Sequence, residues 1–168
     1  MSSSYISKQK LTTSLSLHSS ELNNDIDSII KHKIKENLEG RCFQDGYIIK
    51  DSIRIIKRNL GDIVTNNQRS EIKYKIVYTA EIISPSKGDE IEMKVNNINK
   101  MGVLGYIKLK EGDTSEDSPL IIMVPREYIT DSSVNFNDLI IGQTLHVIVI
   151  GFRIKYNSRN IQIIAKPI

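Results

Sequence analysis

The stretch KYKIVYTAEIISPSKGDEIEMKVNNINKMGVLGYIKL, residues 73–109, determines how the chain is divided. Apolar and polar residues alternate through residues 73–83, and the alternation resumes after a turn that contains Pro85 and Gly88. Alternation of this kind is typical of half-buried strands, whereas proline and glycine favour turns. The pattern therefore predicts that one sheet ends and another begins at this turn, which places a domain boundary there.

The chain has 168 residues, and its 23 basic and 20 acidic residues give a net charge of +3. Attraction to nucleic acid must therefore come from local basic patches and not from the field of the whole molecule. The single cysteine, Cys42, excludes an internal disulfide and has no second cysteine with which to form a zinc site. The first residues do not resemble a signal peptide, and no run approaches the roughly 20 apolar residues of a membrane helix. We expect a soluble, intracellular protein.

The first half of the chain predicts an α+β domain over residues 1–85. Alternation at residues 11–17 predicts a strand. An apolar stripe at spacings of three and four then predicts a helix from about Ser20 to Glu39, which Gly40 would end. Three further strands are predicted at residues 41–50, 52–58 and 72–83. We therefore expect a strand, a helix and an antiparallel sheet.

A long polar stretch, residues 59–70, separates two of these strands, and we interpret it as a connecting loop. It is longer than most hairpin loops, and it contains three aliphatic residues, Leu60, Ile63 and Val64. Aliphatic side chains on an exposed loop indicate a surface that binds a partner.

The second half predicts an all-β domain over residues 86–168. Its five short strands are expected within residues 89–97, 102–109, 120–124 and a long hairpin from about residue 142 to residue 165. A single helical turn is expected at residues 125–129, and the acidic residues 111–118 are interpreted as a solvated loop. Five strands with a small helical insert between the third and the fourth describe an OB barrel.

Several motifs of the chain resemble a known family. KGDEIEMKV at 87–95, MGV at 101–103 and GQTLHVIVI at 142–150 resemble an OB module first described in a large ribosomal protein, here called the S-one type. LEGRC at 38–42, GYI at 46–48, YKIVYTA at 74–80 and PSKGD at 85–89 sharpen the likeness. Together they resemble the larger stalk subunit of multisubunit DNA-dependent RNA polymerases, which is the seventh subunit of the eukaryotic messenger-RNA enzyme and has a counterpart in the archaeal enzyme. The resemblance extends from about residue 11 to residue 168.

The resemblance implies an accessory subunit that docks on a polymerase and performs no catalysis. Its N-terminal tip domain would dock on the clamp region of the largest subunit, and its OB domain would project beside the RNA exit path. The implied partners are the polymerase core, a smaller stalk subunit and, weakly, nascent single-stranded RNA, but no membrane. By position, docking falls on residues 17–23 and 60–67, with contacts expected at His18, Ser19, Ser20, Leu60, Gly61, Asp62, Ile63 and Val64.

OB domains bind single strands by stacking bases on aromatic side chains within a basic groove. The candidates for RNA contact are Lys94, Tyr106, Lys108, Arg153, Lys155, Tyr156 and Arg159. Phe152 is as compatible with core packing as with stacking. Where S-one domains carry aromatic residues on the second and third strands, this chain has Met101, Val103 and Leu104, which leaves Tyr106.

The sequence indicates no catalytic site. It has no glycine-rich phosphate loop, and His18, His32 and His146 lack the spacing of metal ligands. Cys42 has no histidine beside it in the sequence and is interpreted as a small buried residue. We therefore expect no enzymatic activity, no metal and no cofactor.

A free-standing RNA-binding OB protein of translation or RNA decay is the alternative hypothesis. The order of the modules, in which a strand, a helix and a sheet continue directly into the barrel at Pro85, favours the stalk subunit. The compartment stays open: host cytoplasm or virion for a virus, and nucleus for a cellular eukaryote. The abundance of Ile, Asn and Lys indicates AT-biased coding, which favours a large DNA virus or a protist.

Overall fold

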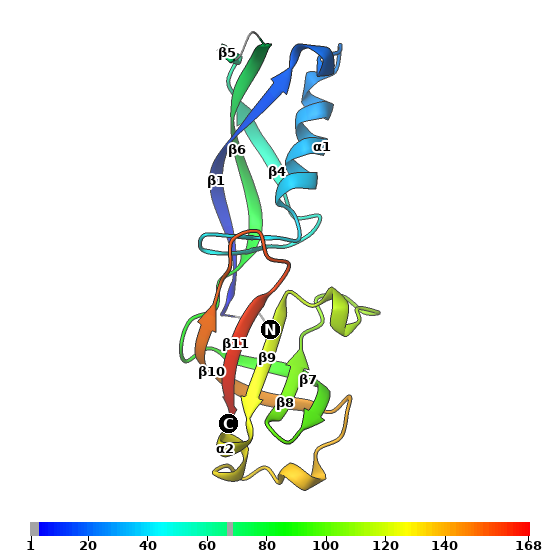
Figure 1. Cartoon of the computed structure of the whole chain (residues 1–168), viewed down its shortest axis with the longest axis vertical. Coiled ribbons are helices and arrows are strands. Elements are labelled where there is room, and N and C mark those ends of the chain that lie inside the picture. The colour runs from blue at the N-terminus through cyan, green and yellow to red at the C-terminus, as the bar shows by residue number, and fades with distance from the viewer. Residues whose placement is uncertain (1–3, 67–68) are drawn as a thin grey trace. The chain divides into compact units, whose positions relative to one another are not determined.

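The computed structural model describes residues 4–66 and 69–168, and it is mostly β, with 49% strand and 17% helix. Its contacts form two compact units (Figure 1). The barrel unit combines Ile83–Ile168 with Gly40–Tyr47 and the described part of Met1–Ser7, and the helix unit combines Lys8–Glu39 with Ile48–Ile82. Neither unit is one continuous stretch of chain. The division into residues 1–85 and 86–168 therefore stays a prediction about functional domains.

Five strands close the barrel in the order β10-β11-β9-β8-β7, and β10 also pairs with β7. They are β7 (Glu90–Asn99), β8 (Gly102–Tyr106), β9 (Leu120–Pro125), β10 (Thr144–Arg153) and β11 (Ile161–Pro167). Neighbouring strands are antiparallel, except that β11 and β9 are parallel. The short helix α2 (Arg126–Thr130) falls between the third and fourth barrel strands, where the sequence predicts a helical turn. This arrangement is that of an OB-like barrel, as predicted.

The barrel closes around side chains that alternate along each strand. Met93, Val103, Ile122 and Val147 are each 0% exposed, and each comes from a different strand. Gly102 has a φ of +146°, and a Cβ at this position would collide with the carbonyl oxygen of a residue on β9. The close approach of β8 to β9 therefore requires glycine.

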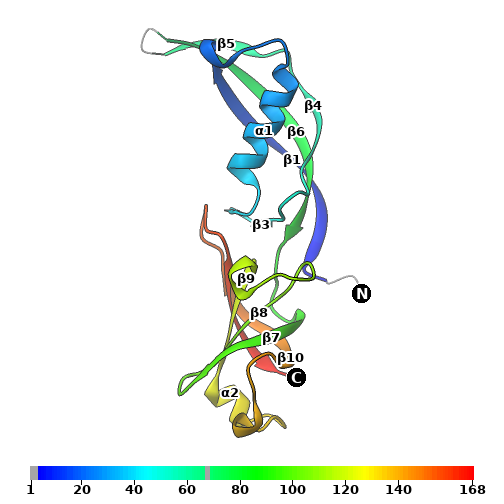
Figure 2. The same ribbon diagram turned by 90° about the vertical axis from the view of Figure 1, so that its right-hand side faces the viewer.

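In the helix unit, the long strand β6 (Arg69–Ile83) pairs along its length with β4 (Arg54–Arg58) and β5 (Asp62–Asn66), and β1 (Ile6–His18) is its neighbour in the sheet. Figure 2 shows helix α1 (Ile26–Leu38) lying over one face of this sheet. Its buried residues, Ile30 and Ile34, are one turn apart, as the predicted apolar stripe requires. Among the described residues, no helix is both long and apolar enough to cross a membrane.

Helix α1 begins at Ile26, which is later than the predicted start near Ser20. Residues 19–21 form a separate 3₁₀ turn. The carboxylate of Asp25 caps the helix by accepting from the backbone N–H of Ser28 at 3.2 Å and from its hydroxyl at 2.7 Å. These bonds lower the pKa of the Asp25 carboxyl. The helix starts at Ile26 because Asp25, and not the earlier serines, satisfies its first backbone donors.

The prediction of a loop over residues 59–70 is wrong in part, because strand β5 lies within it. Ile63 is opposite Ile72, and Val64 is opposite Glu71, so β5 and the start of β6 form an antiparallel hairpin. The β-branched residues of β5 favour a strand, and pairing with β6 outweighs the polar residues around them. Asn67, the last residue of the predicted docking range, lies outside the described residues.

Candidate functional site

Five strands of the barrel place one side chain each in a row on its outer surface, which we call the cross-barrel row. Lys94 on β7 is opposite Tyr106 on β8, Arg153 on β10 is opposite Gln162 on β11, and Gln162 is opposite Ile121 on β9. The antiparallel register of β8 and β9 brings Tyr106 alongside Ile121. Adjacent strands are about 4.8 Å apart, so these side chains form a continuous surface. The register thus gathers three predicted RNA contacts: Lys94, Tyr106 and Arg153.

The other predicted RNA contacts lie outside this row. Lys108 is exposed and follows the end of β8, while Tyr156 and Arg159 are exposed in the loop between β10 and β11. Tyr156 has 77% of its surface exposed and Phe152 has 42%, so neither ring is part of the barrel core. Both rings are accessible for stacking, whereas Tyr106 is half-buried.

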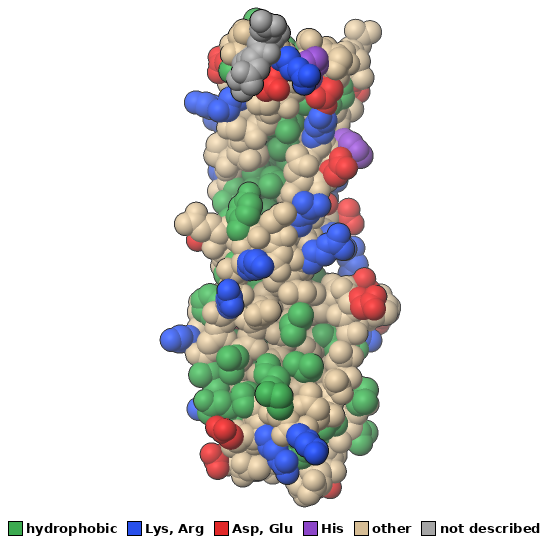
Figure 3. Space-filling view, in the orientation of Figure 1, with side chains coloured by type: hydrophobic (Ala, Val, Ile, Leu, Met, Phe, Trp, Pro, Cys, Tyr) green, Lys and Arg blue, Asp and Glu red, His purple; other side chains and the backbone are tan. Residues whose placement is uncertain are grey.

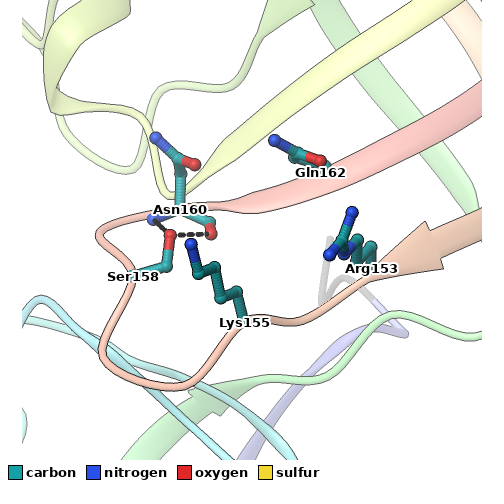
Figure 4. A pocket seen from close by; sticks show the side chains of 5 residues that line it. All are labelled: Arg153, Lys155, Ser158, Asn160 and Gln162. Atoms are coloured by element: carbon teal, nitrogen blue, oxygen red, sulfur yellow. Dashed lines mark hydrogen bonds between the residues drawn. The ribbon is translucent and has the colours of Figure 1, made fainter.

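A small cavity of about 140 Å³ lies beside Arg153, where β10 and β11 leave their connecting loop (Figure 4). Its lining residues are Arg153, Lys155, Ser158, Asn160 and Gln162. In Figure 4 the side chains of Lys155 and Arg153 extend toward Asn160 and Gln162. Two cations therefore meet two side-chain amides, a combination that suits a phosphate group or the polar edge of a base.

The loop that forms this cavity is held by strand β2 (Cys42–Phe43), which is distant in sequence but belongs to the same unit. The backbone N–H of Cys42 donates to the carbonyl of Ser158 at 2.7 Å, and the N–H of Asn157 donates to the carbonyl of Cys42 at 2.8 Å. The φ of +63° at Asn157 is one that asparagine tolerates. Strand β2 pairs in turn with β3 (Gly46–Ile48). The cavity is therefore shaped before any ligand binds.

Cys42 itself is 3% exposed, and burial raises the pKa of its thiol to about 11. The thiol is therefore protonated at neutral pH, and it donates weakly to the carbonyl oxygen of Asn160 at 3.5 Å. A protonated buried thiol is a poor nucleophile. The prediction that Cys42 is a small buried residue is confirmed.

A second row on the same barrel surface is aliphatic. Leu104 on β8 is opposite Met123 on β9, and Met123 is opposite Ile164 on β11, which is 48% exposed. Figure 3 shows hydrophobic side chains gathered over the part of the barrel unit that Figure 1 draws as β9 and β11. Aliphatic side chains do not offer the flat platform on which bases stack. On this surface, stacking is therefore limited to Tyr106, because Phe152 is opposite the buried Ile163 and lies on the other face of its strand.

The aliphatic residues predicted for docking are exposed on the helix unit. Leu60 has 96% of its surface exposed, Ile63 has 79% and Val64 has 42%. Ile63 and Val64 lie on β5, and Leu60 immediately precedes the strand. The hairpin thus presents aliphatic side chains on both faces of β5, as expected for a surface that binds a partner.

The turn that leads into this hairpin is tightly fixed. Gly61 has a φ of +93°, and a Cβ there would collide with the side chains of Ile72 and Tyr74 on β6. The side chain of Asn59 accepts from the backbone N–H of Gly61 at 3.2 Å and from that of Lys75 at 3.0 Å. The exposed side chains are therefore mounted on a defined turn and not on a long loop.

The other predicted docking segment, His18–Ser20, contains the last residue of β1 and the start of the turn that leads to α1. Figures 1 and 2 both draw this turn at the same end of the helix unit as β5. His18 accepts from the backbone N–H of Ser20 at 3.2 Å, and Glu21 accepts from the N–H of His18 at 3.2 Å. Glu21 also pairs with Lys33 on α1. The structure thus brings the two predicted docking segments to one end of this unit.

Sequence reasoning missed Ser158, Asn160 and Gln162. Ser158 and Asn160 lie in the loop before β11, and Gln162 lies on β11 itself. The fold of this loop brings them together, and no regular spacing in the sequence indicated it. Within residues 4–66 and 69–168, no three His, Cys, Asp or Glu side chains are grouped so that they could hold a metal ion.

Comparison of the chain with protein-family models and with curated proteins finds no match. Any assignment of function therefore depends on the geometry of the cross-barrel row, the adjoining cavity and the β5–β6 hairpin.

Proposed function

We propose that this chain is a non-catalytic stalk subunit of a DNA-dependent RNA polymerase. The observation that carries the proposal is the β5–β6 hairpin, on which Leu60 and Ile63 are almost fully exposed. Such side chains on a well-formed turn favour a protein partner. In this proposal the helix unit is the tip domain of the stalk family, and the barrel is an OB domain of the S-one type.

Docking would depend mainly on burial of apolar surface. Each fully buried aliphatic side chain contributes about 1.5–3 kcal/mol, so Leu60, Ile63 and Val64 together would contribute several kcal/mol. The fixed turn at Gly61 supports this, because a preformed surface loses little conformational entropy on binding. The proposed partner is the clamp region of the largest polymerase subunit, with a smaller stalk subunit as a second partner.

In this proposal, emerging RNA would meet the cross-barrel row. Tyr106 would stack against one base, which is worth about 1–3 kcal/mol, and Arg153 with Lys155 would neutralise phosphates. Contacts of this kind are weak, tolerant of sequence and sensitive to salt. They suit a surface along which a transcript moves at the site of transcription.

The test is affinity purification of the tagged chain from its native source, with the bound proteins identified by mass spectrometry. The docking variant combines Leu60→Ser, Ile63→Ser and Val64→Ser. The matched control combines Met101→Ser, Ile140→Ser and Ile141→Ser, which alters equally exposed aliphatic residues of the barrel unit.

We expect the unmodified chain and the control to recover the two largest polymerase subunits. The docking variant should recover about 100-fold less, since the loss of ~2.7 kcal/mol corresponds to that factor. Equal recovery by the docking variant would contradict docking through the hairpin. Absence of polymerase subunits from the unmodified sample would contradict the proposal itself.

A free-standing RNA-binding protein of translation or RNA decay is the second candidate. The cavity lined by Arg153 and Lys155 favours it, because contact with RNA needs no docking surface. The same purification separates the two candidates: recovery of ribosomal or decay components without polymerase subunits would support the second.

A further inference from the structure

The sheet of the helix unit has a second face, turned away from α1, to which the proposed function assigns no role except at the hairpin end, where Val64 is opposite Glu71. On β6 the even-numbered residues from Tyr74 to Ile82 are buried. Because side chains alternate along a strand, the odd-numbered residues, among them Lys73 and Lys75, point to the opposite face. Lys57 on β4 is opposite Val77 of β6 and shares this face.

Strand β1 contributes to the same face. Leu15 and Leu17 are buried, so the exposed even-numbered residues of this strand point away from the core. The exposed residues that β1, β4 and β6 present there include Lys10, Thr12, Ser14, Ser16, Arg54, Lys57, Lys73 and Lys75. We call this surface the open basic face; the residues named are lysines, one arginine and hydroxyl side chains, without an aromatic ring among them.

The lysines of this face, Lys10, Lys57, Lys73 and Lys75, are not engaged in ion pairs in the described residues. On the α1 side of the same unit, by contrast, Arg58 pairs with Asp27 at 2.6 Å. Lysines that remain unpaired on one side of a sheet create a local positive potential, although the whole chain is nearly neutral.

Three carboxylates share the open basic face, and they lie toward its edges. Asp62 is opposite Lys73 at the start of β5, Glu71 is beyond Lys73 toward the hairpin end, and Glu81 is near the other end of β6. The middle of the face, around Lys57 and Lys75, therefore keeps its positive charge.

We propose that the open basic face binds the phosphodiester backbone of nucleic acid without regard to sequence. Lys73 and Lys75 are two residues apart, which separates them by about 6.8 Å along the strand. Lysine and hydroxyl side chains commonly contact phosphates, and the residues named on this face include no aromatic ring on which a base could stack. The serines and threonine of β1 add hydroxyl donors beside the lysines.

The composition of the face favours nucleic acid over an acidic protein segment. Protein interfaces depend on buried aromatic, methionine or arginine anchors. The one arginine named on this face, Arg54, donates to the backbone carbonyls of Asp51 and Ile53, and the other side chains named are lysines and hydroxyls. Binding to a phosphate backbone needs no such anchor, because the release of counterions supplies the affinity. The proposal concerns a surface of the helix unit, separate from the cross-barrel row, and it does not require that the chain dock on a polymerase.

The test measures binding of a fluorescent single-stranded oligouridylate to the full chain by anisotropy, over a series of salt concentrations. The variant combines Lys10→Gln, Lys57→Gln, Lys73→Gln and Lys75→Gln. The matched control combines Lys31→Gln, Lys35→Gln, Lys87→Gln and Lys100→Gln, which removes the same charge elsewhere. A third variant, Arg153→Gln with Lys155→Gln, reports on the barrel, and circular dichroism verifies that each variant folds.

We expect the open-face variant to bind about tenfold or more weakly at about 50 mM salt. The slope of log affinity against log salt should decrease by roughly 2–3, since each phosphate contact to a single strand contributes ~0.7. The control should keep the affinity and the slope of the unmodified chain. The barrel variant should also bind the oligonucleotide more weakly than the unmodified chain. In that variant the lysines of the open basic face should still contribute to the affinity and to the salt slope.

An open-face variant that matches the control in affinity and slope would overturn the proposal. It would also be overturned if that variant kept its affinity for the oligonucleotide but lost binding to fluorescent polyglutamate, which would identify an acidic protein as the partner. Recovery of polymerase subunits by the open-face variant should equal that of the unmodified chain. Failure of docking and failure of this inference are therefore separate results.

Discussion

The cross-barrel row and the docking hairpin are assembled in opposite ways. The row takes Lys94, Tyr106 and Arg153 from three different strands, and only the pairing register of the barrel makes them neighbours. The docking residues of the hairpin, by contrast, lie within a single short stretch of sequence. All three, Leu60, Ile63 and Val64, are exposed. One surface is a product of the whole barrel, and the other is a product of one turn and one hairpin between strands that are adjacent in sequence.

This difference predicts two kinds of binding. A row of separate polar contacts gives modest affinity that decreases gradually as each contact is removed and as salt is raised. A compact aliphatic surface gives affinity that depends on burial and is lost when the patch is made polar. The docking variant described above should therefore show the largest single effect of any change in this chain.

A change at Gly61 would test whether the hairpin depends on its turn. Gly61→Ala places a Cβ at a φ of +93° and against the side chains of Ile72 and Tyr74, so we expect destabilisation by about 2–4 kcal/mol. Gly88→Ala is the matched control, because Gly88 has a φ of +92° with nothing within 4 Å of the added Cβ, and it should cost only about 1–2 kcal/mol. Urea unfolding measures both values. Equal losses would mean that the turn at Gly61 is not tightly packed.

A double change in the cross-barrel row would sharpen the comparison. Tyr106→Ala with Arg153→Gln should weaken binding of single-stranded RNA about tenfold and lower the salt slope by roughly 0.7, because one stack and one phosphate contact are removed. Tyr128→Ala with Lys100→Gln, which removes an exposed ring and a charge elsewhere on the barrel unit, should change neither quantity. Unchanged binding in the row variant would show that RNA does not use this surface.

The smallest expected effect concerns the loop that β2 holds in place. The raised pKa of Cys42 means that the folded state favours the neutral thiol, so its contribution to stability is complete below the ordinary pKa of 9.0 and is lost as the pH rises toward about 11. At pH 8 the native thiol should react slowly with a thiol reagent, and the denatured chain should react fully. Rapid reaction of the native protein would indicate that β2 does not stay on the loop.

Part of this fold was predictable because it depends on local pattern. Period-two alternation located the barrel strands, and glycine and proline located most of the turns. The start of α1 and the strand β5 were not located correctly. In both cases a bond formed in the fold, the cap at Asp25 and the pairing of Ile63 with Ile72, outweighed the local signal.

The sequence by itself determined that the second half would form five short strands with a helical insert, and that Leu60, Ile63 and Val64 would be exposed. These properties follow from alternation and from the polarity of neighbouring residues. Tertiary structure alone decided that Gly40–Tyr47 joins the barrel unit, that Cys42 holds the loop at Ser158, and that Tyr106 and Arg153 share one row. The reason is physical: a backbone hydrogen bond between distant segments depends on pairing register, which no local pattern of side chains specifies.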